Sequence, residues 1–158
     1  MNYEAWSGNA TGAALALVAS LRKKGGRYGD KLGLPFVVAL NSFDVMCTEH
    51  DFDRVLFGDR PDSAMIRPQS GFWGTPATPL FRRVSAVLFT KNLWPETILL
   101  GQVQACLYFN PWAHLPYQGV LSALDSVEYV DGVLKRKAGA PLHELLGVSA
   151  RPAHELGF

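Results

Sequence analysis

Residues that could bind a ligand end a long apolar segment in the first third of the chain. The segment LPFVVALNSFD runs from Leu34 to Asp44, and its first polar side chains include Asn41 and Asp44. A strand covered on both faces reads as a continuous run of apolar residues. Ligands of open α/β sheets collect beyond the carboxyl ends of the strands. The sequence therefore predicts a candidate binding site at Asn41 and Asp44.

Further residues could complete this site. Trp73 lies in the loop before the next predicted strand, and Arg83 stands where that strand begins. Asn110 and Trp112 follow the strand after it. Arg83 could clamp an anion or a carboxylate through two parallel hydrogen bonds, or it could tie the loop to the sheet. In the binding interpretation, these side chains converge with Asn41 and Asp44 on one pocket.

Cys47 and His50 have the spacing of metal ligands. A structural zinc needs four ligands, but the remaining cysteine and histidines supply no second pair. These residues are Cys106, His114, His143 and His154. We therefore predict no metal and no cofactor, and interpret Cys47 as a core cysteine. A helix start could lower the pKa of Cys47, but a cysteine nucleophile also needs a histidine and a third orienting group.

Carboxylates crowd the turn that follows the apolar segment, namely Asp44, Glu49, Asp51 and Asp53. Such a group could hold Mg²⁺ or share a proton. Acidic residues at a helix start more often complement the helix dipole. We favour that role and assign no catalytic residue.

The basic residues form groups at 22–27, 82–83 and 135–137. With aromatic residues such as Trp73 and Trp112 they could follow a nucleic-acid backbone. The formal net charge is only +1, without the basic excess of typical nucleic-acid-binding domains. A pattern of solvated charges is the favoured interpretation, and nucleic acid is the less supported partner.

The composition predicts one globular domain. The chain has 158 residues, 48% hydrophobic and 18% charged, which suffices for one core but not for two ordinary domains. The charged share is below the usual quarter. Together with Phe72 and Trp73 in a Pro-rich loop, it predicts apolar surface that a protein partner or a second copy covers. The sequence does not identify that partner.

The sequence also predicts a cytoplasmic protein that does not enter a membrane. Asn2, Glu4 and Ser7 interrupt any apolar leader, and no apolar run reaches the length of a membrane span. Cys47 and Cys106 lie in apolar surroundings. Two such thiols fit a reducing compartment better than a disulfide framework.

The first half of the chain predicts a helix, a strand and a second helix. Apolar residues recur at the helical period within 10–27, where a basic cluster and a Gly-Gly pair end the helix. The strand covers 35–41. Thr48 to Asp51 resembles a capping box that opens a short helix through Phe57.

The second half predicts a long loop at 58–82, in which Phe72 and Trp73 favour a docked conformation. Antiparallel strands at 83–90 and 98–109 follow.

A hairpin around Asp131-Gly132 within 127–134 and a short helix at 141–146 complete the predicted elements. We expect a flexible lead-in at 1–9, a single domain at 10–147 and a tail at 148–158.

The expected fold is α/β or α+β, a three-layer-like domain with a mixed sheet. The strands at 35–41, 83–90 and 98–109 are its predicted centre, and the helix at 10–27 packs on them.

Several segments, taken in order, resemble a family of uncharacterised bacterial proteins. The similarity covers roughly residues 14–114, in the segments LRKKGGRYGD, LPFVVALNSFD, DRVLFG, GFWG, RRVSAVLFTKN and YFNPWA. They resemble the C-terminal part of that family, whose N-terminal part looks like a restriction-endonuclease-type domain of the PD-(D/E)XK kind.

The resemblance implies that helix 10–27 and strand 35–41 are the last helix and strand of a nuclease-like core. The metal-binding carboxylates of such cores lie on earlier strands, and nothing before Ala10 matches them. The chain would then be a non-catalytic C-terminal remainder, or a short form whose sheet another chain completes. The alternative is a stand-alone module that binds a small ligand or a protein. A small hydrolase that uses Cys47 or Asp44 is the third hypothesis.

Overall fold

The computed structural model describes residues 12–26, 33–43, 47–58, 71–152 and 154. The lead-in expected at 1–9 lies outside them. In chain order the elements are α1 (Gly12–Gly25), β1 (Phe36–Ser42), α2 (Glu49–Phe57), β2 (Val84–Lys91), α3 (Pro95–Leu99), β3 (Gln104–Phe109), the 3₁₀ helix η2 (Val120–Ala123), β4 (Asp125–Val130), β5 (Val133–Lys137) and α4 (Leu142–Leu145).

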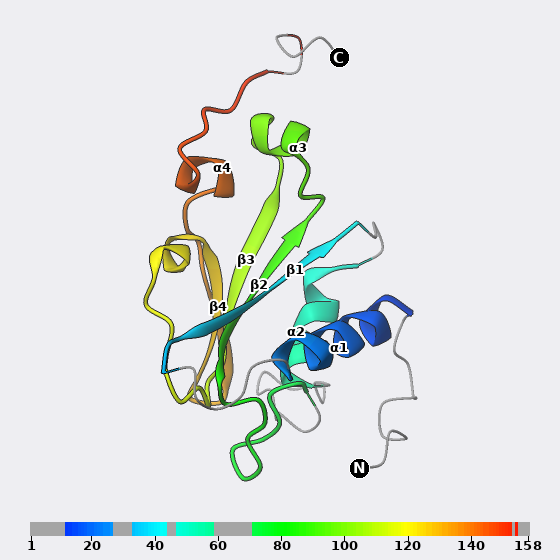
Figure 1. Cartoon of the computed structure of the whole chain (residues 1–158), viewed down its shortest axis with the longest axis vertical. Coiled ribbons are helices and arrows are strands. Elements are labelled where there is room, and N and C mark those ends of the chain that lie inside the picture. Colours follow the sequence, from blue (N-terminus) through cyan, green and yellow to red (C-terminus); the bar gives the residue numbers. More distant parts are fainter. Residues whose placement is uncertain (1–11, 27–32, 44–46, 59–70, 153, 155–158) are drawn as a thin grey trace.

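One mixed sheet forms the centre of the fold, with the strand order β1-β2-β3-β4-β5 (Figure 1). β1 pairs parallel with β2, and β3 pairs parallel with β4. The β2–β3 and β4–β5 pairs are antiparallel. The expected mixed sheet with helices packed on it is confirmed.

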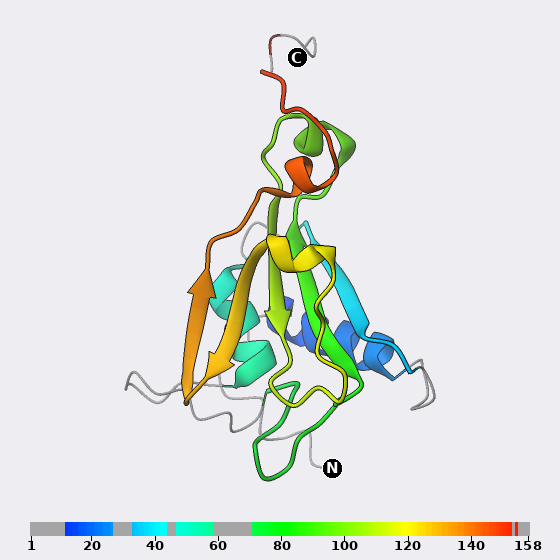
Figure 2. The ribbon, with the colours of Figure 1, turned by 90° about the vertical axis from the view of Figure 1, so that its left-hand side faces the viewer.

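Different segments cover the two faces of the sheet. Figures 1 and 2 show α1 and α2 on one face, whereas the segment that contains η2 crosses the opposite face. Helices α3 and α4 lie together beyond one end of the sheet. The chain after α4 stays attached there, because the backbone N–H of Arg151 donates to the carbonyl of Leu99 at 2.8 Å.

Strand β1, predicted to be central and buried on both faces, is an edge strand with one exposed face. Val38, Leu40 and Ser42 are buried, but the alternate residues Ala39 and Asn41 are exposed. Figure 2 shows that the segment around η2 leaves β1 uncovered. The continuous apolar run was therefore a wrong indicator of two-sided burial, because on the outward face Val37 is only half-buried and the small residue Ala39 is exposed.

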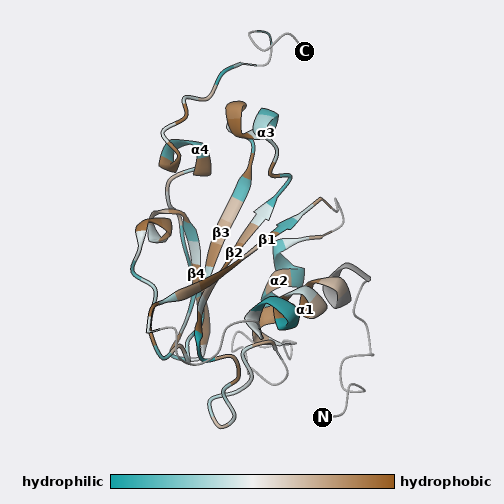
Figure 3. Ribbon diagram, viewed as in Figure 1, coloured by the Kyte–Doolittle hydropathy of each residue, from teal (hydrophilic) through white to brown (hydrophobic). Residues whose placement is uncertain are grey.

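The C-terminal end of α1 packs against β1 and the loop before β2. Lys24 Nζ donates to the carbonyl of Ala39 at 2.8 Å, and Arg22, Lys23 and Lys24 occupy the last helical turn. Figure 3 shows this polar end of α1 next to the apolar middle of the sheet. Cations at this position complement the carbonyl end of the helix, so the predicted role of the basic cluster agrees with the fold.

Helix α2 begins with the predicted capping box. The Asp51 N–H donates to Thr48 Oγ1 at 3.3 Å, and the Thr48 N–H donates to Asp51 Oδ2 at 2.9 Å. The helix ends at Phe57, where Gly58 adopts a φ of 96°. These local signals decide both ends of the helix.

The second antiparallel strand is shorter than predicted. The antiparallel pairing of β2 with β3 is confirmed, but β3 begins at Gln104 and residues 95–99 form α3. Pro95 occupies the first turn of α3, where its fixed φ favours a helix. Gly101, with a φ of 67°, then redirects the chain toward β3. A short apolar run such as 98–100 does not distinguish a helical turn from a strand by its period.

The β4–β5 hairpin has the predicted turn. Asp131 and Gly132 both have positive φ, 54° and 83°, as a type I′ turn requires. The pairs Val130↔Val133 and Glu128↔Lys135 follow from this turn. Helix α4 also forms where a short helix was expected.

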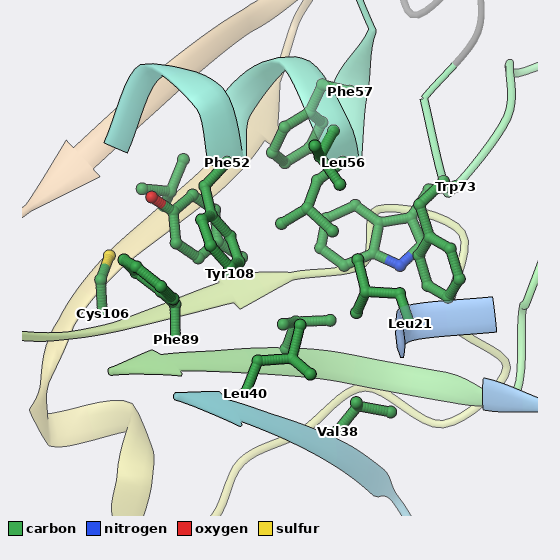
Figure 4. Packing of buried hydrophobic residues seen from close by; sticks show 14 of the residues in the cluster. Leu21, Val38, Leu40, Phe52, Leu56, Phe57, Trp73, Phe89, Cys106 and Tyr108 are labelled. Carbon is green, nitrogen blue, oxygen red and sulfur yellow. The ribbon is translucent and has the colours of Figure 1, made fainter. Parts of the chain in front are cut away.

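The core lies between the sheet and the two helices α1 and α2 (Figure 4). Phe52 of α2 contacts Phe89 of β2 with ring centroids 3.7 Å apart. Phe57 meets the edge of Trp73 at 5.0 Å. The docked conformation predicted for the loop around Phe72 and Trp73 is thus confirmed, and the loop completes the core.

Candidate functional site

Asn41, the first predicted site residue, connects β1 to the loop after β2. Its side chain is exposed, and its Oδ1 accepts hydrogen bonds from Thr90 Oγ1 and from the Leu93 N–H, each at 3.1 Å. The amide therefore holds together the C-terminal ends of the parallel strands β1 and β2 and the start of the loop after β2. Asp44 lies outside the described residues.

Trp73 is a core residue. Its side chain is 1% exposed and packs on Phe57 of α2. Its backbone carbonyl accepts from the Leu80 N–H at 2.8 Å, which closes the loop on itself. The indole Nε1 is buried without a hydrogen-bond partner in the described part of the chain. Burial at this depth removes Trp73 from any surface site.

Asn110 fastens the loop before β2 to the end of β3. It is 6% exposed. Its Nδ2 donates to the carbonyls of Phe81 at 3.2 Å and Val84 at 2.8 Å, and its Oδ1 accepts from the Trp112 N–H at 2.9 Å. All the polar atoms of this side chain are thus engaged with backbone groups, which is how buried amides are normally satisfied.

Arg83 and Trp112 also have structural partners. The Arg83 guanidinium donates to the carbonyl of Gly25 at the end of α1, so it ties this helix to the sheet, whereas the structural role predicted for Arg83 was to tie the preceding loop to the sheet. Trp112 is half-buried and packs edge-on against Tyr129 with ring centroids 6.2 Å apart. Its carbonyl accepts from Arg82 Nε at 3.3 Å.

The predicted residues that the structure describes do not share one pocket. Asn41 pairs with Thr90 at one end of β2, whereas the Asn110 N–H donates to the Ser85 carbonyl at the other end. Five residues of strand separate these ends by roughly 17 Å. Trp73, Arg83, Asn110 and Trp112 all lie toward the Ser85 end, but each is engaged in holding the fold.

A cavity of about 500 Å³ lies instead on the face of the sheet opposite α2. Tyr129 of β4 stacks on Phe57 of α2, so its neighbours Glu128 and Val130 point to the other face, as the alternation of a strand requires. Phe109 of β3 and Ser126 of β4 extend the cavity floor, and Lys137 of β5 lies on its rim.

The segment between β3 and β4 forms the other wall of this cavity, with Pro111, Tyr117 and Ser122. Tyr117 Oη accepts from the Leu121 N–H at 3.3 Å, which folds the tyrosine onto its own turn. The Ala140 N–H donates to the Ala123 carbonyl at 2.7 Å, so the end of η2 is fixed to the chain after β5. The wall is thus held in place by one hydrogen bond within the segment and one to the chain after β5.

Polar groups at this cavity are uncommitted. Glu128 and Lys137 are exposed, and within the described residues neither side chain has an ion pair or hydrogen bond. Ser122 Oγ is buried and has no partner there either. A buried hydroxyl without a partner costs free energy, so a group that enters the cavity and bonds to it is stabilised.

A second cavity of about 320 Å³ lies on the α2 side, between Glu49, Cys106 and Asp125. Burial, and next the charge of Glu49, raise the pKa of the Cys106 thiol to about 12. Burial likewise raises the pKa of Tyr108. Both groups are therefore protonated near neutral pH, and a protonated thiol is not a nucleophile.

The acidic residues of α2 are bound within the fold. Arg136 Nη2 lies 2.6 Å from Asp53 Oδ2, and Arg136 Nη1 lies 3.2 Å from Glu49 Oε2. Asp51 closes the capping box with Thr48. Among the residues that the structure describes, no group of three His, Cys, Asp or Glu side chains could hold a metal ion. Cys47, the proposed core cysteine, is 1% exposed.

Sequence reasoning missed the cavity residues Glu128, Lys137 and Ser122. The predicted turn at Asp131-Gly132 contained part of the signal, because its register places Glu128 and Lys137 on one face of the hairpin. The amino-acid sequence contains no comparable signal for the position of the opposite wall, because that position depends on how the segment after β3 crosses the sheet.

No helix in the described part of the chain is long and apolar enough to cross a membrane. Comparison of the chain with protein-family models, with curated proteins and with solved structures found no match.

Proposed function

We propose that this protein is a non-catalytic module that binds a small ligand in the cavity between η2 and the β4–β5 hairpin. The observation that carries the proposal is the set of uncommitted polar groups, Glu128, Lys137 and Ser122, around one cavity of about 500 Å³. Pockets for small molecules have volumes of roughly 300–1,000 Å³ and combine apolar walls with a few polar groups. This cavity has both properties.

The chemistry of the other candidate groups supports a binding role rather than catalysis. Burial raises the pKa of the Cys106 thiol to about 12, so this thiol stays protonated near neutral pH. Cys47 is buried in the core. Asp53 and Glu49 are paired with Arg136. Cys47 and Cys106 do not form a disulfide, which fits the reducing cytoplasm as the proposed location.

The proposal is tested by NMR, with a library of small metabolites titrated into the ¹⁵N-labelled chain. We expect ligands to shift the backbone amides of 117–122 and of β4 and β5. Ser122→Tyr fills the cavity and should abolish these shifts, whereas Ser20→Tyr, on the exposed side of α1, should retain them. The spectrum of each variant shows whether it is folded. If no compound shifts these amides in the unmodified chain, the proposal is wrong.

A second candidate is the non-catalytic remainder of a nuclease-like protein, supported by the edge position of β1. A strand from another chain could extend the sheet there, next to the helix and strand that the resemblance identifies as the end of a nuclease core. This hypothesis predicts that the pure chain does not cleave DNA. Nicking of supercoiled plasmid in Mg²⁺, abolished by EDTA, would contradict it.

A further inference from the structure

We propose that the ligand of this cavity is a small zwitterion with an apolar body, namely a free α-amino acid or a dipeptide with an apolar side chain. This inference rests on the proposed binding function and specifies its ligand. It follows from opposite charges held on one face of the β4–β5 hairpin, from the apolar wall that faces them, and from the unpartnered hydroxyl on that wall.

The hairpin places one anionic and one cationic side chain at a defined separation. Ser126 pairs directly with Lys137, and Glu128 with Lys135, so Glu128 and Lys137 are diagonal neighbours on the same face. Such positions lie roughly 7–8 Å apart. Within the described residues, Glu128 and Lys137 form no ion pair with each other or with another group. They can therefore accept an ammonium group and a carboxylate from one ligand.

The opposite wall supplies a fixed apolar surface. The Tyr117 ring lies against the backbone of its own turn, where a Cβ on Gly119 would come within 2.4 Å of the Tyr117 hydroxyl oxygen. The Leu121 N–H donates to that oxygen. With Phe109 and Pro111, this ring offers an apolar side chain a contact surface that loses little conformational entropy when the ligand binds.

Ser122 provides a polar contact at the same wall. Its Oγ is buried without a partner in the part of the chain that the structure describes, and a hydroxyl both donates and accepts hydrogen bonds. It can donate to the ligand carboxylate beside Lys137 or accept from the ligand ammonium. Either bond satisfies an otherwise unpaired buried group.

The charge pattern disfavours the other common classes of small ligand. A phosphate or nucleotide would meet the Glu128 carboxylate beside the Lys137 cation, and like charges repel. A neutral sugar could use the hydroxyl and the Tyr117 ring but would leave the opposite charges without counter-charges. A zwitterion matches both signs.

Wild-type protein tests the inference with L-phenylalanine and its singly charged derivatives. N-acetyl-L-phenylalanine lacks the ammonium charge, L-phenylalaninamide lacks the carboxylate, and D-glucose represents sugars. We expect L-phenylalanine to bind about tenfold more tightly than either derivative, a difference of about 1.4 kcal/mol, because each derivative loses one hydrogen bond between charged groups. Amide shifts in β4, β5 and residues 117–122 report the dissociation constants.

Matched variants assign each charge to its partner. Glu128→Gln should weaken L-phenylalanine about tenfold and leave N-acetyl-L-phenylalanine unchanged, because that derivative has no ammonium group to lose. Lys137→Met should weaken L-phenylalanine similarly and leave L-phenylalaninamide unchanged. Lys135→Met, on the same strand and face but outside the cavity, is the control and should alter each constant by less than about twofold.

The outcomes separate this inference from the proposed function. Equal binding of L-phenylalanine and its derivatives would overturn the zwitterion assignment and leave the cavity as a ligand site. Binding of glucose or another metabolite in place of amino acids and dipeptides would do the same. If neither these probes nor the metabolite library shifts the cavity amides, both the inference and the proposed function are wrong.

Discussion

Arg136 is held between two carboxylates that differ strongly in exposure. The Asp53 side chain is 5% exposed, whereas the Glu49 side chain is 59% exposed and that of Arg136 is 44% exposed. Burial alone would lower the pKa of Arg136, but the charge of the Asp53 carboxylate raises it. The buried partner therefore dominates this ion pair, and the exposed one is screened by water.

We predict that Asp53→Asn lowers the free energy of unfolding by roughly 1–3 kcal/mol, because it weakens a charged hydrogen bond whose acceptor is buried. Glu49→Gln, which changes the exposed partner of the same arginine, should cost less than about 1 kcal/mol. Urea denaturation measures both values. Equal losses for the two variants would contradict the dominant role of Asp53.

Cys106 makes the stability of the fold sensitive to alkaline pH. Burial raises its pKa from the ordinary 9.0 to about 12, so between these values the unfolded chain releases a proton that the folded chain keeps. The stabilisation is complete below pH 9 and is lost as the pH rises, by up to about 1.4 kcal/mol per pH unit. Tyr108, whose pKa burial also raises, adds to the loss above its ordinary value of 10.0.

Urea denaturation at pH 8, 9 and 10 tests this linkage. The unfolding free energy of the unmodified chain should fall more steeply between pH 9 and 10 than that of Cys106→Ala, because the alanine variant lacks the thiol. The comparison uses the slope of the unfolding free energy against pH, because the cavity left by the alanine lowers the unfolding free energy equally at each pH. Identical slopes would show that Cys106 does not hold its proton in the folded state.

At the scale of single elements, the capping box of α2 is a local signal with a measurable contribution. Thr48→Ala removes the side-chain acceptor of the Asp51 N–H and should destabilise the protein by about 1 kcal/mol. Ser20→Ala, at an exposed position within α1, is the control and should change stability by less than about 0.5 kcal/mol. Thermal unfolding followed by circular dichroism gives both values; a cost for Ser20→Ala as large as that for Thr48→Ala would argue against the cap.

The β4–β5 turn is the second element with a local cause. Gly132 has a φ of 83°, which other residues reach only with strain, so Gly132→Ala should cost roughly 1–2 kcal/mol. Asp131→Asn should be tolerated, because asparagine favours positive φ at this position. Urea denaturation compares the two variants. If Gly132→Ala is neutral, the turn does not set the hairpin register that places Glu128 and Lys137 on one face.

At the scale of the whole molecule, the strand order predicts a gradient of local stability. β2 and β3 are paired on both sides, whereas β1 and β5 are paired on one side only. Amide hydrogen exchange should therefore be slowest in β2 and β3 and faster in β5. Protection factors measured by NMR check this order, and equal protection of β3 and β5 would contradict it.

The same scale explains why the predicted site residues differ from the cavity residues. Asn110 and Arg83 carry polar groups at the ends of strands, as site residues do. In the fold their side chains bond to the backbone carbonyls of Val84, Phe81 and Gly25. Whether a polar side chain meets a ligand or its own backbone depends on which loops pack against it, and that is a tertiary property.

The amino-acid sequence by itself determined the elements with local physical causes. The capping box began α2, the Asp-Gly pair made the β4–β5 turn, and the pattern of β2 and β3 predicted their antiparallel pairing. Only the tertiary structure decided that β1 lies at an edge and that Glu128, Lys137 and Ser122 surround one cavity. Caps and turns depend on neighbouring residues, whereas strand order and cavities depend on contacts between segments far apart in the chain.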